Sequence, residues 1–212
     1  MKLLILGAAG RVAKILTNYL LEQTDFDLVL YARDANKRIK NNSPRVNLID
    51  GDFTDKNSLK FALKDVDTVY LNHMADEKEV SQILDVIKTS KVKKIIVASI
   101  LGIYAEVAGE FGEWNKKMVG INRINSQKNC AKLVEDLGID YTILRLTWLY
   151  NDSNNKAYTL TQRNEPFYGA QVTREAVSQL IVDILKDSSS KYKNASIGVS
   201  EPNTNWSKPG FY

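Results

Sequence analysis

Small residues at a regular spacing follow the first apolar run of the chain, and such a spacing can hold a phosphate group. Residues 3–6 are Leu-Leu-Ile-Leu, and the turn after them reads Gly7-x-x-Gly10-x-x-Ala13. Gly7 permits a tight exit from a strand, Gly10 lets a pyrophosphate approach the backbone, and Ala13 lets a helix lie close to the sheet. The amides at the start of that helix attract phosphate. The pattern predicts a dinucleotide-binding turn; the alternative is a close-packed corner without a ligand.

The tip of the next expected strand carries a basic residue where NAD-preferring sites carry an acidic one. Such sites place Asp or Glu about 20 residues after the glycines, where it binds the ribose hydroxyls. Here the tip reads Tyr31-Ala32-Arg33, and an arginine can pair with a 2′-phosphate. Arg11 can add a second positive contact, whereas the alternative is that Arg33 is a solvated loop residue. We therefore expect NADP(H) to be preferred over NAD(H). The contacts expected so far are Gly7, Ala9, Gly10, Arg11, Val12 and Arg33.

The same first residues can also be read as a secretion signal, because they combine a basic residue, an apolar run and small residues. A signal peptide needs an apolar core of roughly 7–15 residues. The run here ends at Gly7, and Arg11 follows soon after. We therefore interpret the segment as mature protein.

The composition is that of one globular α/β domain. The chain has 212 residues, of which 44% are hydrophobic and 25% charged, and a formal net charge of +4. No basic stripe interleaves with aromatic residues, so nucleic-acid binding is not expected. No apolar run approaches the roughly 20 residues that span a bilayer, so we expect no membrane partner. The single cysteine, Cys130, suits a reducing cytoplasm, and no metal site is expected.

The elements that must position these residues alternate between strand and helix. Strands are expected at 3–6, 27–32, 45–50, 67–72, 93–100, 139–146 and 195–199, and helices at about 12–20, 55–63, 77–90, 123–137 and 174–187. This alternation predicts an α/β fold with a Rossmann-type doubly wound parallel sheet and a single domain over 1–212. Thr173 is expected to cap the last helix. Residues 104–122 have no clear assignment, and about 147–172 form an irregular segment beside the pocket, of which 151–170 is polar and loop-like.

Six motifs, in their order along the chain, resemble the atypical short-chain dehydrogenases/reductases, in the NmrA-like and NAD(P)H-binding branch. They are GAAGRVA (7–13), YARD (31–34), IDGDFTD (49–55), VASILG (97–102), GIDYTILRLTWLY (138–150) and VTREAV (172–177). The resemblance covers nearly the whole chain. It implies that Asp52 and Phe53 flank the adenine and that Ser99 lies beneath the nicotinamide. It also implies that the adenosine ribose and pyrophosphate pass Asn72, His73 and Met74.

The proton donor of the wider family is missing. Its enzymes use a tyrosine and a lysine four residues later on one helix face, where the ammonium lowers the pKa of the phenol. None of the ten tyrosines here has a lysine at that spacing. On the helix where the family carries the pair, Lys128 is present, but Ile124 occupies the place of the tyrosine.

Other residues can be proposed for catalysis, each with a plainer alternative. Tyr104 follows Ser99 by five residues and can reach the nicotinamide, or it can simply pack the segment around it. Lys128 can contact the ribose or be a solvated helical lysine. The catalytic candidates are therefore Ser99, Tyr104 and Lys128. Trp148 and Tyr150 stand where the substrate pocket of the family opens, as pocket wall or as core.

Two functions are compatible with the missing tyrosine. One is an NADPH-dependent reductase of a small acceptor, such as a quinone or a flavin, that needs no proton donor from the protein. The other is a non-catalytic NADP(H) sensor that signals through a protein partner, as NmrA-like proteins can. The residues do not decide between the two.

Overall fold

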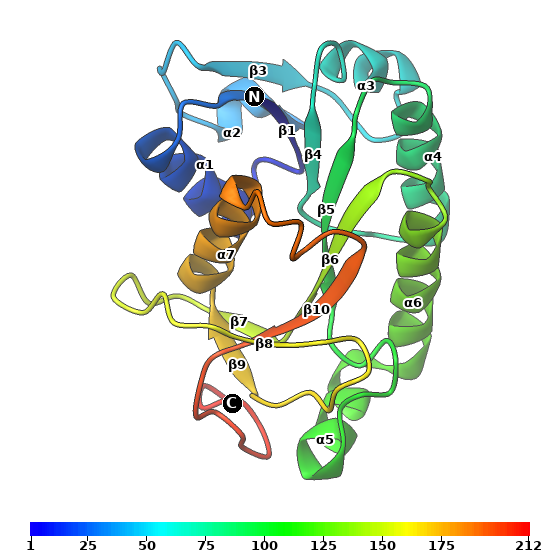
Figure 1. The fold of residues 1–212 in the computed structure, drawn as a ribbon, viewed down its shortest axis with the longest axis vertical. Coiled ribbons are helices and arrows are strands. Elements are labelled where there is room, and N and C mark those ends of the chain that lie inside the picture. The colour runs from blue at the N-terminus through cyan, green and yellow to red at the C-terminus, as the bar shows by residue number, and fades with distance from the viewer.

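The computed structural model describes residues 1–212 as one central sheet with helices on both faces (Figure 1). The strands are β1 (Lys2–Leu6), β2 (Asp27–Ala32), β3 (Val46–Asp50), β4 (Thr68–Leu71), β5 (Lys94–Ile100), β6 (Asp140–Leu146), β7 (Trp148–Tyr150), β8 (Thr159–Thr161), β9 (Gln171–Thr173) and β10 (Ala195–Ser200). The helices are α1 (Arg11–Gln23), α2 (Ala35–Arg38), α3 (Lys56–Ala62), α4 (Glu77–Lys88), α5 (Gly109–Val119), α6 (Ile121–Glu135) and α7 (Arg174–Lys186).

The strand order of the main sheet is β3-β2-β1-β4-β5-β6-β10-β8. Every neighbouring pair is parallel except β10 with β8. In the central strand, Ile5 faces Leu30 of β2 on one side and Tyr70 of β4 on the other. The order reverses between β1 and β4, which is the switch point at which open α/β sheets bind ligands. The expected Rossmann-type doubly wound fold and its single domain are confirmed.

Both faces of the sheet are buried. Leu3 and Ile5 of β1 belong to a core of 27 buried residues beneath α1 and α7, whereas Leu4 and Leu6 belong to a core of 26 on the opposite face. Side chains alternate between the faces of a strand, so a strand covered on both sides needs a continuous apolar run. Figure 1 shows α4 and α6 along one side of the sheet and α1 and α7 on the other.

The last helix starts where the sequence predicts. The Thr173 hydroxyl accepts a hydrogen bond from the Ala176 amide at 2.9 Å, which confirms the expected cap. Ser178, one turn further along, lies against α1 and donates to the Val12 carbonyl at 3.3 Å. The final helix is therefore fixed to the helix that follows the glycine turn.

Residues 104–122, left unassigned from the sequence, contain helix α5. Gly112 lies inside this helix. Because glycine has a low helix propensity, the sequence did not predict a helix there. A Cβ atom at Gly112 would stand 2.3 Å from the Val107 carbonyl oxygen. The close approach of helix and loop therefore requires a residue without a side chain there.

The expectation of an irregular segment over 147–172, loop-like over 151–170, is partly wrong. β7 pairs with β9 in a small parallel sheet, and β8 adds an antiparallel edge to β10. Each of these strands has three residues, too few to show an alternating pattern. Helix α2, of four residues, escaped detection for the same reason.

Two general features of the structure bear on possible ligands and partners. None of its helices has both the length and the apolar character needed to cross a membrane. Nowhere do three or more His, Cys, Asp or Glu side chains gather as metal ligands.

A buried ion pair fixes the loop after β5. Arg145 of β6 is fully buried, and its Nη1 donates to Glu106 Oε1 at 2.6 Å. Glu106 also accepts the amides of Gly102 at 3.0 Å and Tyr104 at 2.9 Å. On its other side, Arg145 donates to the Gln162 carbonyl at 2.9 Å. One guanidinium therefore connects the loop after β5 with the segment after β8.

We expect Glu106→Gln to lower the free energy of unfolding by about 3–5 kcal/mol, because it leaves the buried Arg145 charge without a counterion. Urea unfolding measures this loss. The matched control is Lys132→Gln, which breaks the exposed pair with Asp136 and should cost less than about 1 kcal/mol. Equal, small losses in the two variants would contradict this account of the loop.

Candidate functional site

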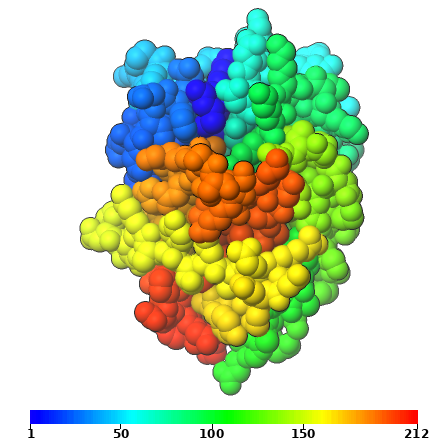
Figure 2. All heavy atoms as spheres, in the orientation of Figure 1, coloured from blue at the N-terminus to red at the C-terminus, as the bar shows by residue number.

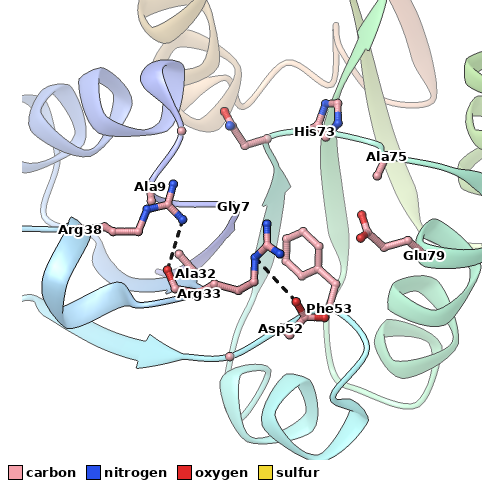
Figure 3. A pocket seen from close by; sticks show the side chains of 13 residues that line it. Gly7, Ala9, Ala32, Arg33, Arg38, Asp52, Phe53, His73, Ala75 and Glu79 are labelled. Carbon is pink, nitrogen blue, oxygen red and sulfur yellow. Dashed lines mark hydrogen bonds and ion pairs between the residues drawn. The ribbon is translucent and has the colours of Figure 1, made fainter. Parts of the chain in front are cut away.

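A cavity of about 400 Å³ lies at the carboxyl ends of β1 to β4, on the switch point of the sheet. Eight of the residues expected to bind the cofactor line it (Figure 3): Gly7, Ala9, Gly10, Arg33, Asp52, Phe53, Asn72 and His73. Five further residues in its wall were not expected: Ala32, Arg38, Gly51, Ala75 and Glu79. The structure thus brings together residues that span more than seventy positions of the chain.

The glycine turn forms the floor of this cavity. Gly7 has a φ of +79°, and its amide donates to the Tyr31 carbonyl at 3.0 Å. The Gly10 amide donates to the Gly7 carbonyl at 3.0 Å. A Cβ atom at Gly10 would stand 2.3 Å from Asn72 Nδ2, so any other residue would push the Asn72 amide aside. Gly10 therefore lets the Asn72 amide lie close to the backbone of the turn.

Helix α1 directs its first amides at this floor. It begins at Arg11, and no side chain caps it at Gly10. The first amides of a helix have no partner within it and carry a partial positive charge. The Tyr70 hydroxyl donates to Asn72 Oδ1 at 3.1 Å, which holds the Asn72 side chain beside the turn. These donors suit a phosphate group.

Two arginines stand at the tip of β2. Arg33 Nε lies 3.7 Å from Asp52 Oδ2, and Arg38 Nη1 donates to the Arg33 carbonyl at 3.3 Å (Figure 3). Both Asp50 carboxylate oxygens accept backbone amides, from Asp34 at 3.2 Å and Ala35 at 3.1 Å. Asp50 thereby fixes the turn into α2 and places both guanidinium groups at the cavity. The only sequence signal for Arg38 was a basic residue five positions after Arg33.

Asp52 and Phe53 form the adjoining wall. The Tyr31 hydroxyl donates to the Asp52 carbonyl at 2.7 Å, and the Tyr31 and Phe53 rings stack with centroids 5.9 Å apart. Hydrogen bonds from Thr54 and the charge of Arg33 hold the pKa of Asp52 below its ordinary value. Phe53 offers a flat apolar surface beside an ionised carboxylate.

Three of the expected residues contribute differently from what the sequence suggested. The Met74 side chain is fully buried in the core, and its carbonyl accepts from Gln127 Nε2 at 2.7 Å. Val12 lies on the buried face of α1. The Arg11 side chain does not line the cavity, and its charge acts on Arg174 of α7 instead. Only backbone amides of Val12 and Arg11 remain directed at the turn.

His73 lies at the rim of the cavity, next to Arg123. Partial burial and then the Arg123 charge lower the pKa of His73 from its ordinary value of 6.5. Arg123 in turn donates to the carbonyl oxygens of Ala75 and Met74. His73 is therefore neutral at pH 7 and can donate or accept a hydrogen bond there.

The three catalytic candidates do not form one cluster. Tyr104 and Lys128 line a separate cavity of about 190 Å³ together with Ile124. Ser99 of β5 is buried, its hydroxyl has no hydrogen-bond partner, and it pairs in register with Arg145. The sequence could not show this separation, because it depends on how the loop after β5 folds back.

The Tyr104 hydroxyl is already engaged. It donates to Glu135 Oε1 at 2.8 Å, and the Arg163 guanidinium lies 4.3 Å from the centre of its ring. Burial and the Glu135 contact raise the pKa of Tyr104 to about 12. The phenol is therefore a weak acid at neutral pH in this arrangement.

A third cavity, of about 420 Å³, opens past the ends of β5 and β6. Trp148 lines it, and its Nε1 donates to Asn115 Oδ1 at 3.0 Å. Tyr150 does not line it; the Tyr150 hydroxyl donates to Glu201 Oε2 at 2.7 Å. Phe211 and Tyr212 form part of the wall, and Figure 2 shows the red C-terminal residues at one end of the molecule. No pattern in the sequence assigned these two residues to a pocket.

Comparisons with known proteins agree with this geometry. Residues 7–188 match a family model described as NAD(P)H-binding. The chain is similar to a short-chain dehydrogenase/reductase from Veillonella parvula DSM 2008, solved in complex with NADP, with 33% identity and a TM-score of 0.96 over 99% of both chains. A Rossmann-fold NAD(P)-binding family protein from Shigella flexneri matches with 30% identity and a TM-score of 0.81, over 100% of this chain and 98% of that one.

A more distant structure shares the fold alone. The anaerobillin reductase ChuY from Escherichia coli O157:H7 matches with 18% identity and a TM-score of 0.74, over 96% of this chain and 98% of that one. A comparison with the sequences of curated proteins finds no significant match.

We expect the Hε1 resonance of His73, the only histidine, to titrate below the ordinary value of 6.5 in an NMR pH series. Since the fold disfavours the protonated imidazole, this group reduces the free energy of unfolding as the pH falls below 6.5. Arg123→Gln should move the midpoint upward, and Arg123→Lys, which keeps the charge, should not. A titration midpoint of His73 that is the same in the wild type and in both variants would show that Arg123 does not act on His73.

Proposed function

The chain belongs to the NAD(P)H-binding family of short-chain dehydrogenase/reductase-type proteins, and on that premise we propose that it is an NADPH-dependent reductase of a small acceptor, such as a quinone or a flavin. The observation that carries the proposal is the pair Arg33 and Arg38 at the tip of β2, in the wall of the switch-point cavity. No acidic residue occupies that tip.

The residues of the switch-point cavity suit the adenine, the 2′-phosphate and the pyrophosphate of NADP(H). The amides at the start of α1 and the Asn72 amide beside Gly10 suit the pyrophosphate. Phe53 offers a face for the adenine, and Arg33 and Arg38 stand where a 2′-phosphate projects. The similar Veillonella parvula protein was solved in complex with NADP, which supports this choice of ligand. Preference over NAD(H) follows from the two guanidinium groups, because only the 2′-phosphate of NADP(H) would add a charge-assisted contact to the partners they already have.

The choice of acceptor follows from the missing proton donor. When bound, the cofactor supplies the hydride. Ile124 cannot exchange a proton, and the Tyr104 hydroxyl is held by Glu135 with its pKa raised to about 12. A quinone that receives the hydride becomes a hydroquinone anion and takes one proton from water, with NADP⁺ as the oxidised product. The protein then needs only to position the acceptor and shield the site, which Trp148 and the apolar wall around it can do.

A non-catalytic NADP(H) sensor that signals through a protein partner is the second candidate. Two observations favour it: Ile124 stands in the place of the tyrosine, and the Tyr104 hydroxyl is held by Glu135. A protein that performs no reduction needs neither a tyrosine at position 124 nor a free Tyr104 phenol. In either role we place the protein in the cytoplasm, since its single cysteine, Cys130, is buried and unpaired.

Arg33→Ala and Arg38→Ala should each weaken NADPH binding roughly tenfold or more, because loss of a charge-assisted contact to phosphate costs on the order of 1.5–3 kcal/mol. NADH binding should change little, and isothermal titration calorimetry measures both. Lys37→Ala is the matched control, since Lys37 is a cation of the same helix that does not line the cavity. Equal weakening of NADPH and NADH would count against a 2′-phosphate site.

Lys128→Ala should retain most of the rate of quinone reduction, because Ile124 stands in the place of the tyrosine and the phenol that shares the Lys128 cavity, Tyr104, already donates to Glu135. The measurement is NADPH turnover with a panel of quinones, flavins and aldehydes. Loss of turnover with NADPH binding intact would reveal a proton relay through Lys128. If the wild-type protein reduces no acceptor at all, the sensor function replaces the reductase.

A further inference from the structure

The cavity past the ends of β5 and β6 is apolar except at one edge. Eight of its ten lining residues are hydrophobic, and its volume of about 420 Å³ suits a small molecule. Three of the walls are aromatic: the ring centroids of Trp148 and Tyr212 lie 5.1 Å apart, and those of Phe211 and Tyr212 lie 5.4 Å apart. Such faces favour a flat, conjugated ligand.

The charged edge of the cavity is Arg174, the first residue of α7. Its side chain is half-buried, and Nη1 donates to Asn151 Oδ1 at 2.8 Å. None of the ion pairs in the structure includes Arg174. The neighbouring Glu175 accepts the Asp152 amide at 3.3 Å. Arg174 is thus a partly desolvated cation beside an apolar wall; it makes no ion pair, and only the charge of Glu175 partly offsets its own. An anionic group of a ligand in the cavity would gain a charge-assisted contact there.

A second cation, Arg11, also acts on Arg174. Arg11, at the start of α1, also belongs to no ion pair. Burial and then the Arg11 charge lower the pKa of Arg174. The Glu175 charge acts in the opposite direction, so Arg174 of the cavity wall has one positive and one negative neighbour.

We infer that Arg174 anchors an anionic group of the acceptor, so that the preferred substrate is a planar, conjugated, apolar molecule with a carboxylate or a similar anionic substituent. The inference rests on the proposed reductase function. An anion at Arg174 has a second possible source, the pyrophosphate of the cofactor, which the start of α1 also attracts. Arg174 lines the acceptor cavity and not the switch-point cavity, which favours the acceptor as the source.

The test compares a neutral naphthoquinone with a naphthoquinone sulfonate as acceptors. Arg174→Gln should raise the KM for the sulfonate roughly tenfold or more. The KM for the neutral quinone and the Kd for NADPH should each change less than about twofold. Arg174→Lys keeps the charge and should restore most of the preference for the sulfonate.

A matched control separates the charge from the local hydrogen bond. Asn151→Ala removes the partner of Arg174 and leaves its guanidinium in place. The ratio of the two KM values should therefore persist in this variant. A ratio lost in Asn151→Ala but kept in Arg174→Gln would overturn the inference.

Three further outcomes would also overturn or decide it. Weaker NADPH binding in Arg174→Gln with the sulfonate unaffected would assign Arg174 to the cofactor, with the reductase function intact. Equal losses for both quinones would show a purely structural role.

If the wild-type protein reduces neither quinone, the proposed function fails. Quenching of tryptophan fluorescence in the NADP⁺-bound protein then still measures binding of the acceptor beside Trp148. Tighter binding of the sulfonate that Arg174→Gln abolishes then supports the anchor, and equal binding of both quinones refutes it.

Discussion

The reversal of strand order between β1 and β4 is the constraint from which the cavities of this protein follow. Connections leave β1 toward one face of the sheet and β4 toward the other, so no helix covers the carboxyl ends of the two strands where they meet. The turn at Gly7 and the side chain of Asn72 border that gap. Everything that can recognise a dinucleotide, from the first amides of α1 to the arginines after β2, is arranged around it.

Arginines in this fold fall into two groups that differ in whether the protein neutralises them. Arg145 is fully buried, and Glu106 compensates its charge at 2.6 Å, so it serves the fold. Arg33 has only a loose, exposed partner in Asp52 at 3.7 Å, and Arg174 has none. A compensated charge stabilises its surroundings, whereas an uncompensated one at a cavity gains most when an anion arrives. This contrast distinguishes Arg145, which stabilises the fold, from Arg33 and Arg174, which line cavities and suit the binding of an anion.

Most of the fold and eight of the thirteen residues that line the nucleotide pocket could be predicted from the sequence. Gly7, Ala9, Gly10 and Arg33 follow from local patterns, whereas Asp52, Phe53, Asn72 and His73 came from the family resemblance. The apolar run of β1, the glycine turn and the tip at Arg33 all lie in short segments whose periodicity is strong. Arg38 was missed because α2 is a single turn, and α5 because Gly112 serves a close approach to Val107 rather than helix propensity. The engagement of Tyr104 by Glu135 was beyond local reasoning, since 31 positions separate the two residues. The wall formed by Phe211 and Tyr212 depends in the same way on contacts between distant segments.

The packing of α7 on α1 has a consequence for the order in which the molecule can assemble. Every residue that lines the switch-point cavity lies between Gly7 and Glu79, so a ribosome releases the entire nucleotide pocket early. Yet the apolar face of α1 is covered by α7, and the contact between Ser178 and Val12 closes a separation of 166 residues. Such a closure makes folding slow and leaves apolar surface exposed meanwhile. The nucleotide pocket therefore becomes stable only when the chain is almost complete, and a nascent chain cannot use NAD(P)H as an early template for folding.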